Sequence, residues 1–271
     1  MNSGFQALRA TDVSLAYGRT PIVHGADIAL RAGTVTALVG PNGSGKSTLL
    51  RGLTALHRPT GGTVVFADGA DASALGERDL ARRIAMLAQA HPEPSGVSVR
   101  EVVAYGRFAH RGRFRAADVD GIAVVDRAMA ATGIVDLADH AVSQLSGGQR
   151  QRVWLATCLA QQTGIVLLDE PTTYLDLRYQ REILEIVRDL ADEGVAVGIV
   201  LHDLEQAAEI ADEVVLLVRG RIVATGTPAE VLTAERLSAA YEVPVEVEAV
   251  ADGLRIRPTR LRRRLPVSRA A

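Results

Sequence analysis

The sequence predicts an α/β fold with a mostly parallel sheet covered by helices on both faces. Short apolar runs rich in β-branched residues alternate with segments of helical periodicity across residues 34–218, which is typical of such sheets. A glycine-rich turn joins the first of these strands to a helix. The chain has 271 residues, enough for one large domain or for one domain with an inserted lobe.

The glycine-rich turn has the sequence GPNGSGKST and lies between a predicted strand at residues 34–39 and a predicted helix. In this context the pattern indicates a P-loop, whose backbone N–H groups and helix N-terminus bind phosphate oxygens. We expect Lys46 to contact the β- and γ-phosphates and the Ser47 hydroxyl to ligate Mg²⁺. The predicted nucleotide-binding residues of this turn are Gly40, Pro41, Asn42, Gly43, Ser44, Gly45, Lys46, Ser47 and Thr48.

Residues 5–39 consist of strand-like runs that end in glycine, which predicts a small antiparallel sheet beside the P-loop. Tyr17 precedes a turn in this region and is either an adenine-stacking ring or a half-buried strand residue. Residues 72–84 have helical spacing, and the apolar strand at 85–89 ends at Gln89. A glutamine at this place can reach a metal-bound water or can simply be a polar surface residue.

Residues 99–107, 116–132 and 134–139 are predicted to be helical, with little strand signal between them, and indicate an inserted helical lobe. The sequence LSGGQ follows and opens a long helix that runs towards Gln161. Its serine and glycines suggest a second helix N-terminus that binds an anion. The alternative is an ordinary helix cap that contains glycine.

Two further strands end in polar residues that suit phosphate chemistry. The strand at 164–169 ends in Asp169 and Glu170. We expect Asp169 to hold Mg²⁺ and Glu170 to polarise the attacking water, the alternative being an acidic pair at a helix start. The strand at 194–201 ends at His202, where ligands bind in open parallel sheets. A last strand is expected at 212–218, and then a turn that leads into a short helix at 228–232.

Composition argues against several classes of protein. The net charge of −2 and the pI near 6.3 give no overall basic field for nucleic acid. The lone Cys158 lies in an apolar helical run and is interpreted as a buried thiol in a reducing cytoplasm. The first residues, MNSGFQALRA, lack the apolar core that is typical of a signal peptide, and no apolar run approaches the ~18 residues that span a bilayer. Action at a membrane would therefore require docking onto a membrane protein.

Five elements, GPNGSGKST, Gln89, LSGGQ, LLDEP and His202, occur in one order that resembles the ATP-binding subunits of ABC transporters over nearly the whole chain. The resemblance implies a P-loop NTPase core with an N-terminal antiparallel β subdomain and an inserted helical subdomain at about residues 90–160. It places a single ATPase domain at 5–240 and a C-terminal extension with an Arg-rich tail at 241–271. The tail is either a solvated terminus or a contact with anionic headgroups or a permease.

The resemblance also implies site roles and an assembly. Two copies would pair head to tail, with each ATP between the P-loop of one and the LSGGQ of the other. Tyr17 would stack on adenine. Catalysis would depend on Glu170 as the base, with His202 and Gln89. Mg²⁺ and its waters would be bound by Ser47, Gln89 and Asp169. The residues expected to contact the ATP of the partner copy are Ser146, Gly147, Gly148, Gln149 and Asp176.

A finer resemblance links residues 89–110 and the sequences LAQQT, PTTYLD, LHDLEQA and GTPAEVLT to the ATPases of importers for ferric siderophores, haem and vitamin B12. PTTYLD and LAQQT favour the siderophore branch, while Ala88 stands where relatives usually carry proline. The resemblance implies two membrane permease subunits, an extracytoplasmic binding protein as an indirect partner, and a peripheral location at the cytoplasmic face of the membrane. The loop after Gln89 and the helical lobe would contact the permease.

Other interpretations stay open at this point. The chain could energise import of haem or vitamin B12 instead of a siderophore. A soluble ABC ATPase acting on DNA or ribosomes is disfavoured, because such proteins usually carry two cassettes or a coiled-coil insertion. A regulator without turnover is disfavoured by Glu170, and an exporter half by the absence of fused membrane helices.

Overall fold

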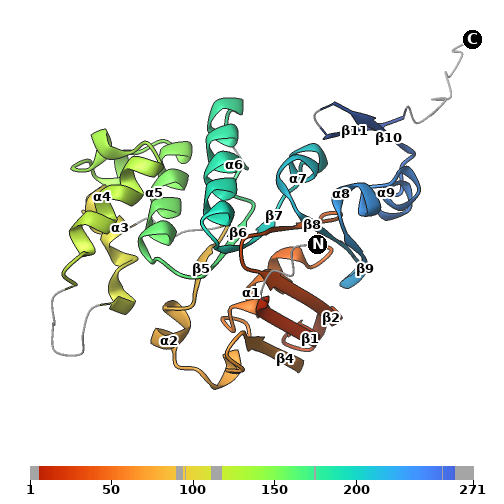
Figure 1. Cartoon of the computed structure of the whole chain (residues 1–271), viewed down its shortest axis with the longest axis horizontal. Coiled ribbons are helices and arrows are strands. Elements are labelled where there is room, and N and C mark those ends of the chain that lie inside the picture. The colour runs from red at the N-terminus through yellow and green to blue at the C-terminus, as the bar shows by residue number, and fades with distance from the viewer. Residues whose placement is uncertain are drawn as a thin grey trace, which may run out of the picture.

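The computed structural model describes residues 6–89, 94, 96–110, 118–173, 175–251 and 253–259. Within these residues the centre is a six-stranded sheet in the order β5-β6-β7-β3-β8-β9 (Figure 1). The first five strands of this order pair in parallel, and β9 pairs with β8 antiparallel. In sheet order they are β5 (Ile84–Leu87), β6 (Ile165–Asp169), β7 (Ala196–Val200), β3 (Val35–Val39), β8 (Glu213–Val218) and β9 (Arg221–Gly226). The mostly parallel sheet confirms the predicted α/β fold.

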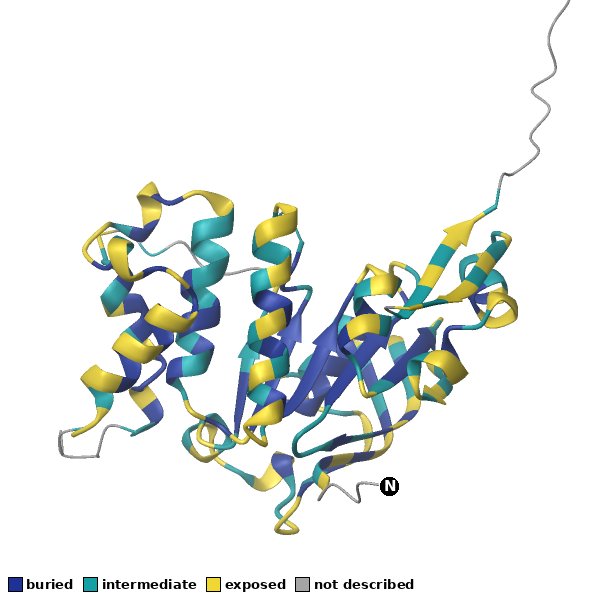
Figure 2. Cartoon of the chain, turned by 45° about the horizontal axis from the view of Figure 1, so that its top comes forward, coloured by how far each residue is buried: buried dark blue, intermediate teal, exposed yellow. Residues whose placement is uncertain are grey.

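The central strands are buried on both faces, as Figure 2 shows. Ala37 and Val39 of β3 pack into one core with α6 (Leu177–Asp192) and α7 (Leu204–Ile210). Leu38 points the other way and packs into a second core with α1 (Lys46–Leu53). Because successive side chains point to opposite faces and both faces are covered, these strands have continuous apolar sequences.

A second sheet confirms the predicted antiparallel β subdomain. Its order is β2-β1-β4, with β2 (Thr20–Arg31), β1 (Gln6–Tyr17) and β4 (Gly61–Phe66) all antiparallel. Its buried side chains, such as Leu8 and Leu15, share one apolar cluster with Leu49 and Leu50 of α1. The P-loop helix is therefore packed against both sheets.

The helix expected over residues 72–84 forms only in pieces. A 3₁₀ turn at Ala72–Ala74 begins where the Asp71 carboxylate accepts a hydrogen bond from the Ser73 N–H at 2.8 Å. After Gly76 comes the short helix α2 (Glu77–Ala81). Glycine is a poor helix residue, and Ile84 pairs with Ile165 in the sheet, so the chain must be extended there.

The inserted helical subdomain is present as a lobe with its own core. It contains α3 (Val99–Tyr105), α4 (Gly121–Ala131) and α5 (Gly147–Ala160), drawn in yellow to green in Figure 1. The three helices meet around buried residues that include Val103, Met129 and Val153. The helix expected at 134–139 is a single 3₁₀ turn, Val135–Leu137.

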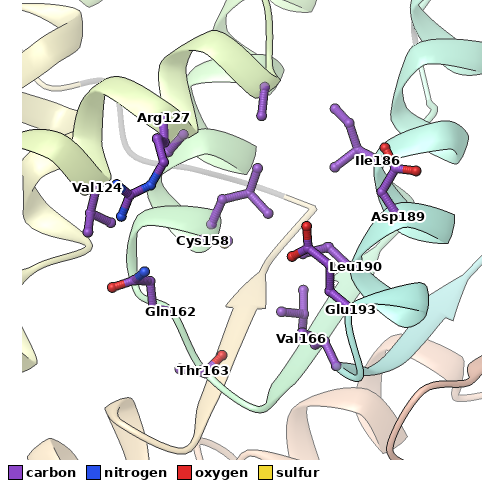
Figure 3. Close-up of a pocket in the computed structure, with 14 residues that line it drawn as sticks. Val124, Arg127, Cys158, Gln162, Thr163, Val166, Ile186, Asp189, Leu190 and Glu193 are labelled. Atoms are coloured by element: carbon purple, nitrogen blue, oxygen red, sulfur yellow. The ribbon is translucent and has the colours of Figure 1, made fainter.

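A cleft of about 570 Å³ lies between this lobe and the central sheet (Figure 3). The lobe contributes α4 and α5 to its walls, and α6 forms the facing side. Arg127 lies on the lobe side, Asp189 lies on α6, and Glu193 is the C-cap of that helix. Cys158 belongs to the same wall and is buried, as the sequence predicts. Burial raises the pKa of its thiol to about 12.

Cys158 is expected to be inert in the folded chain. At about pH 8 a disulfide reagent should label it only after denaturation, because the reactive species is the thiolate. The unfolded thiol ionises near pH 8.5, so above that pH only the unfolded state gains the thiolate. Stability should therefore fall from about pH 8.5 up to the folded pKa of about 12, and Cys158→Ala should remove this part of the decline. Full labelling of the native protein within seconds would contradict the prediction.

The C-terminal part differs most from expectation. Instead of a simple turn before the helix at 228–232, the chain forms the edge strand β9 and then α8 (Pro228–Val231) and α9 (Ala234–Tyr241). A hairpin follows, β10 (Val245–Val250) and β11 (Gly253–Pro258). Its partly buried side chains pack against the main core, and the Ile256 N–H donates to Glu205 of α7 at 2.8 Å. The boundary between a domain at 5–240 and an extension stays a prediction.

Two features bear on contact with a membrane. Among the described residues, no helix combines the length and apolar composition needed to cross a bilayer. The Arg-rich run at 260–264 lies outside the described residues.

Candidate nucleotide-binding site

The P-loop connects β3 to α1, and its glycines are required by its path. Gly40 has φ 143°, and a Cβ there would lie 2.0 Å from the Leu217 carbonyl oxygen. Gly43 and Gly45 have φ 75° and 100°, values that glycine adopts at little cost. Gly45 is the N-cap of α1 and provides no side-chain cap. The first N–H groups of the helix are therefore available to an anion.

Lys46 is held inside this loop. Its side chain is only 5% exposed, and Nζ donates to the carbonyl oxygens of Gly40 at 2.8 Å and Pro41 at 3.0 Å. Burial lowers the pKa of the ammonium group, while the nearby Glu170 and Asp169 carboxylates oppose this effect. The buried Lys46 ammonium group and the available N–H groups at the start of α1 together form a site that suits a polyanion.

Asp169 ends β6 and has no exposed surface. The Ser47 hydroxyl donates to its Oδ1 at 2.7 Å, whereas Oδ2 is buried without a hydrogen-bond partner among the described residues. Burial raises the pKa of this carboxyl group. A hydroxyl and a carboxylate oxygen that lacks a partner are the hard oxygen ligands that Mg²⁺ prefers. The residues therefore fit the predicted metal.

Glu170 directly follows and is held from two sides. Its Oε2 accepts a hydrogen bond from Gln89 Nε2 at 2.8 Å, and its Oε1 lies 2.6 Å from His202 Nε2. Glu170 has φ 55°, a left-handed conformation that a non-glycine residue adopts only under local constraint. The three side chains follow β5, β6 and β7, which are neighbours in the sheet. Adjacent parallel strands thus bring them together at their carboxyl ends.

A cavity of about 570 Å³ joins these parts into one site. It contains the predicted catalytic side chains and most of the P-loop. Sequence reasoning missed Ile22 and Thr173, which also line it. Ile22 gave no signal because it is an ordinary apolar strand residue, whereas the Thr173 hydroxyl, 3.5 Å from Glu170 Oε2, belongs to a polar turn that could have been considered. The lining residues are Ile22, Asn42, Gly43, Gly45, Lys46, Ser47, Thr48, Gln89, Glu170, Thr173 and His202.

Tyr17 lies at the end of β1 and is 48% exposed. Its ring packs on the His57 ring, with centroids 4.6 Å apart and planes tilted by 56°. The His57 Nε2 donates to the Ala16 carbonyl at 2.9 Å. Tyr17 is not among the described residues that line the cavity, so its stacking on adenine stays a prediction.

The LSGGQ residues lie elsewhere, at the start of α5 in the helical lobe (Figure 1). The Ser146 hydroxyl accepts from the Gln149 N–H at 3.3 Å, and the Gln149 side chain accepts from the Ser146 N–H at 2.8 Å. Ser146 and Gly147 are exposed. Asp176 caps α6 by accepting from the Tyr179 N–H at 3.0 Å. The described lining of the cavity includes neither LSGGQ nor Asp176, so anion binding at the start of α5 stays a prediction.

Comparisons with known proteins agree with this geometry. A family model described as ABC transporter matches residues 23–173. The ferric enterobactin transport ATP-binding protein FepC of Escherichia coli is 43% identical over 89% of both chains. The cobalamin import ATP-binding protein BtuD of Halobacterium salinarum is 45% identical over 89% of this chain and 60% of its own length. A solved metal-chelate type ABC transporter in an inward-facing conformation matches with a TM-score of 0.79, 28% identity, and coverage of 94% of this chain and 98% of the other. The chain therefore belongs to the ABC transporter family.

Proposed function

We propose that the chain is the ATP-hydrolysing subunit of an importer that energises uptake of a ferric siderophore across the cytoplasmic membrane. The observation that carries the ATPase activity is the Glu170 carboxylate, held between Gln89 and His202 in the P-loop cavity. Similarity to FepC supports the siderophore as cargo. A cobalamin importer is the second candidate, because the chain is 45% identical to BtuD, although the match covers only 60% of the length of BtuD.

ATP hydrolysis at this site is mostly a matter of position and charge. The P-loop N–H groups and Lys46 bind the phosphates, and His202 contacts the γ-phosphate. Glu170 orients the attacking water and accepts its proton as the oxygen attacks the γ-phosphorus in line. Ser47, Asp169 and Gln89 would hold Mg²⁺ and its waters. The metal neutralises charge on the phosphate oxygens when it is bound.

A head-to-tail homodimer completes each site. The start of α5 presents the exposed Ser146 and Gly147 and lies outside the cavity of its own chain. A second copy would place this helix N-terminus against the γ-phosphate of the ATP bound by the first. Asp176 would lie in the loop that crosses the same interface. ATP would then hold two half-sites together, and hydrolysis would release them.

The permease is proposed to dock beside α2. A groove of about 640 Å³ there is lined by apolar side chains that include Leu75, Leu80 and Met86. Leu56 also lines it and is 77% exposed. Gln161, the C-cap of α5, lines the groove and donates to the Ile84 carbonyl at 3.0 Å. The groove thus lies where β5, which leads to Gln89, meets the helical lobe. A short amphipathic helix of a permease subunit fits such a groove, so that two copies of the chain would bind two permease subunits. This docking would place the chain at the cytoplasmic face of the membrane. An extracytoplasmic binding protein would deliver the cargo.

Uptake measurements test the proposed cargo. Disruption of the gene in its own organism is expected to abolish uptake of ⁵⁵Fe-labelled siderophore and to leave labelled cobalamin uptake intact. Complementation with the wild-type chain should restore uptake, and the Glu170→Gln chain should not. Loss of cobalamin uptake with normal iron uptake would support the second candidate and reject the first.

A further inference from the structure

The loop that links Glu170 to α6 spans residues 171–176, and side-chain amides hold it at Pro171, Thr172 and Leu175. Gln180, one turn into α6, donates through Nε2 to the carbonyl oxygens of Thr172 at 3.3 Å and Leu175 at 3.1 Å. The two acceptors lie near opposite ends of the loop, two residues after Glu170 and one before Asp176. One amide group therefore fixes the distance between the two ends.

A second amide connects this contact to the helix that follows His202. Gln206 of α7 donates through Nε2 to Gln180 Oε1 at 3.0 Å. Its Oε1 accepts from the Thr172 hydroxyl at 3.4 Å. The Gln206 N–H in turn donates to Asp203, the N-cap of α7, at 3.1 Å. The loop after Glu170 is thus tied to α7, the helix that follows His202.

A third amide comes from the LSGGQ helix. Gln151 of α5 donates through Nε2 to the Pro171 carbonyl oxygen at 3.3 Å. Gln151, Gln180 and Gln206 are all half-buried, and they reach the same loop from three different helices. We call these three side chains the amide clamp.

The chemistry of the clamp requires amides. A glutamine has both N–H donors and a carbonyl acceptor, so Gln180 can donate to the loop and accept from Gln206 at once. A glutamate in its place would direct carboxylate oxygens at two backbone carbonyls and leave those acceptors without donors. The affected backbone is continuous with Glu170, whose own carbonyl accepts from the Thr173 N–H at 3.3 Å.

We propose that Gln180 and Gln206 are positioning residues that set the place of Glu170 through the 171–176 loop, so that the rate of hydrolysis depends on them while ATP affinity does not. This rests on the proposed role of Glu170 as the base. Neither glutamine lines the cavity as described, so they act on the loop and not on the nucleotide. The clamp also connects α5 and α7 to the loop that follows Glu170.

The test uses steady-state ATP hydrolysis by the full-length chain. Gln180→Glu is expected to lower kcat about tenfold and to leave KM for ATP within about twofold, since only the orientation of Glu170 changes. Gln206→Leu removes one link and should act in the same direction with a smaller effect. Gln6 is exposed and lies far from Gln180 in the sequence. The variant Gln6→Glu makes the same chemical change there and serves as the matched control, with wild-type kinetics expected.

The clamp predicts a further signature that general loss of structure would not produce. Because both glutamines act on one loop, the double variant Gln180→Glu/Gln206→Leu should lose little more kcat than Gln180→Glu alone. Unchanged kcat in Gln180→Glu, additive losses in the double variant, or a rise in KM as large as the fall in kcat would overturn the proposal. Failure of the wild-type chain to hydrolyse ATP would instead reject the proposed function itself.

Discussion

Glu170→Gln is expected to reduce ATP hydrolysis by about a thousandfold, within the range that a positioned general base contributes. The amide keeps the shape of the side chain and can still contact Gln89 and His202. It cannot take a proton from water, so the chemical step fails while the binding surface stays in place. The measurement is single-turnover hydrolysis of radiolabelled ATP by the purified chain.

The same variant should bind ATP as tightly as the wild type, because phosphate binding depends on the P-loop. A fluorescent ATP analogue titrated against both chains provides this control. Residual hydrolysis within tenfold of the wild type would exclude Glu170 as the base and would point to base-independent water attack.

Lys46→Ala is expected to weaken ATP binding about a hundredfold, which corresponds to roughly 2.7 kcal/mol. The reason is that the Lys46 ammonium is the buried positive charge of the loop, held between the carbonyls of Gly40 and Pro41. Its loss leaves the N–H donors of the P-loop without the charge that neutralises the phosphates. Equilibrium titration with the same fluorescent analogue measures the effect.

An exposed arginine provides the matched control for the loss of a cation. Arg19 is exposed at the β1–β2 turn and lies outside the described lining of the cavity. Arg19→Ala should leave ATP affinity unchanged. Equal affinity of Lys46→Ala and Arg19→Ala would show that Lys46 has no part in binding the phosphates.

The site was largely predictable because the sequence marks the ends of buried parallel strands. Gln89, Asp169, Glu170 and His202 each follow an apolar run, and parallel strands end at one edge of the sheet. What the sequence could not supply was the lateral order of the strands. That order places β5, β6 and β7 side by side, and from it follow the contacts of Glu170 with both Gln89 and His202.

The remaining differences arise where tertiary contacts override local pattern. The periodicity of residues 72–84 suggested one helix, but β5 requires Ile84 in the sheet. Strand β9 and the β10–β11 hairpin are half-exposed. The sequence of β9, RIVATG, alternates only weakly, whereas VEVE in β10 and LRIR in β11 alternate apolar with charged residues, a strand pattern from which the hairpin could have been predicted. Tyr17 meets His57, which lies 40 positions later in the sequence, and no local pattern connects the two. The amide clamp could not be predicted for the same reason, since its glutamines lie on three different helices.

The central claim is that ATP joins two copies of this chain through separate half-sites. Static light scattering of the Glu170→Gln chain with and without Mg-ATP tests it most directly. The account predicts a doubling of mass with ATP, and a return to the monomer mass when Ser146→Arg is added, because the arginine would block the exposed start of α5. A Glu170→Gln chain that binds ATP and keeps the monomer mass would contradict the account.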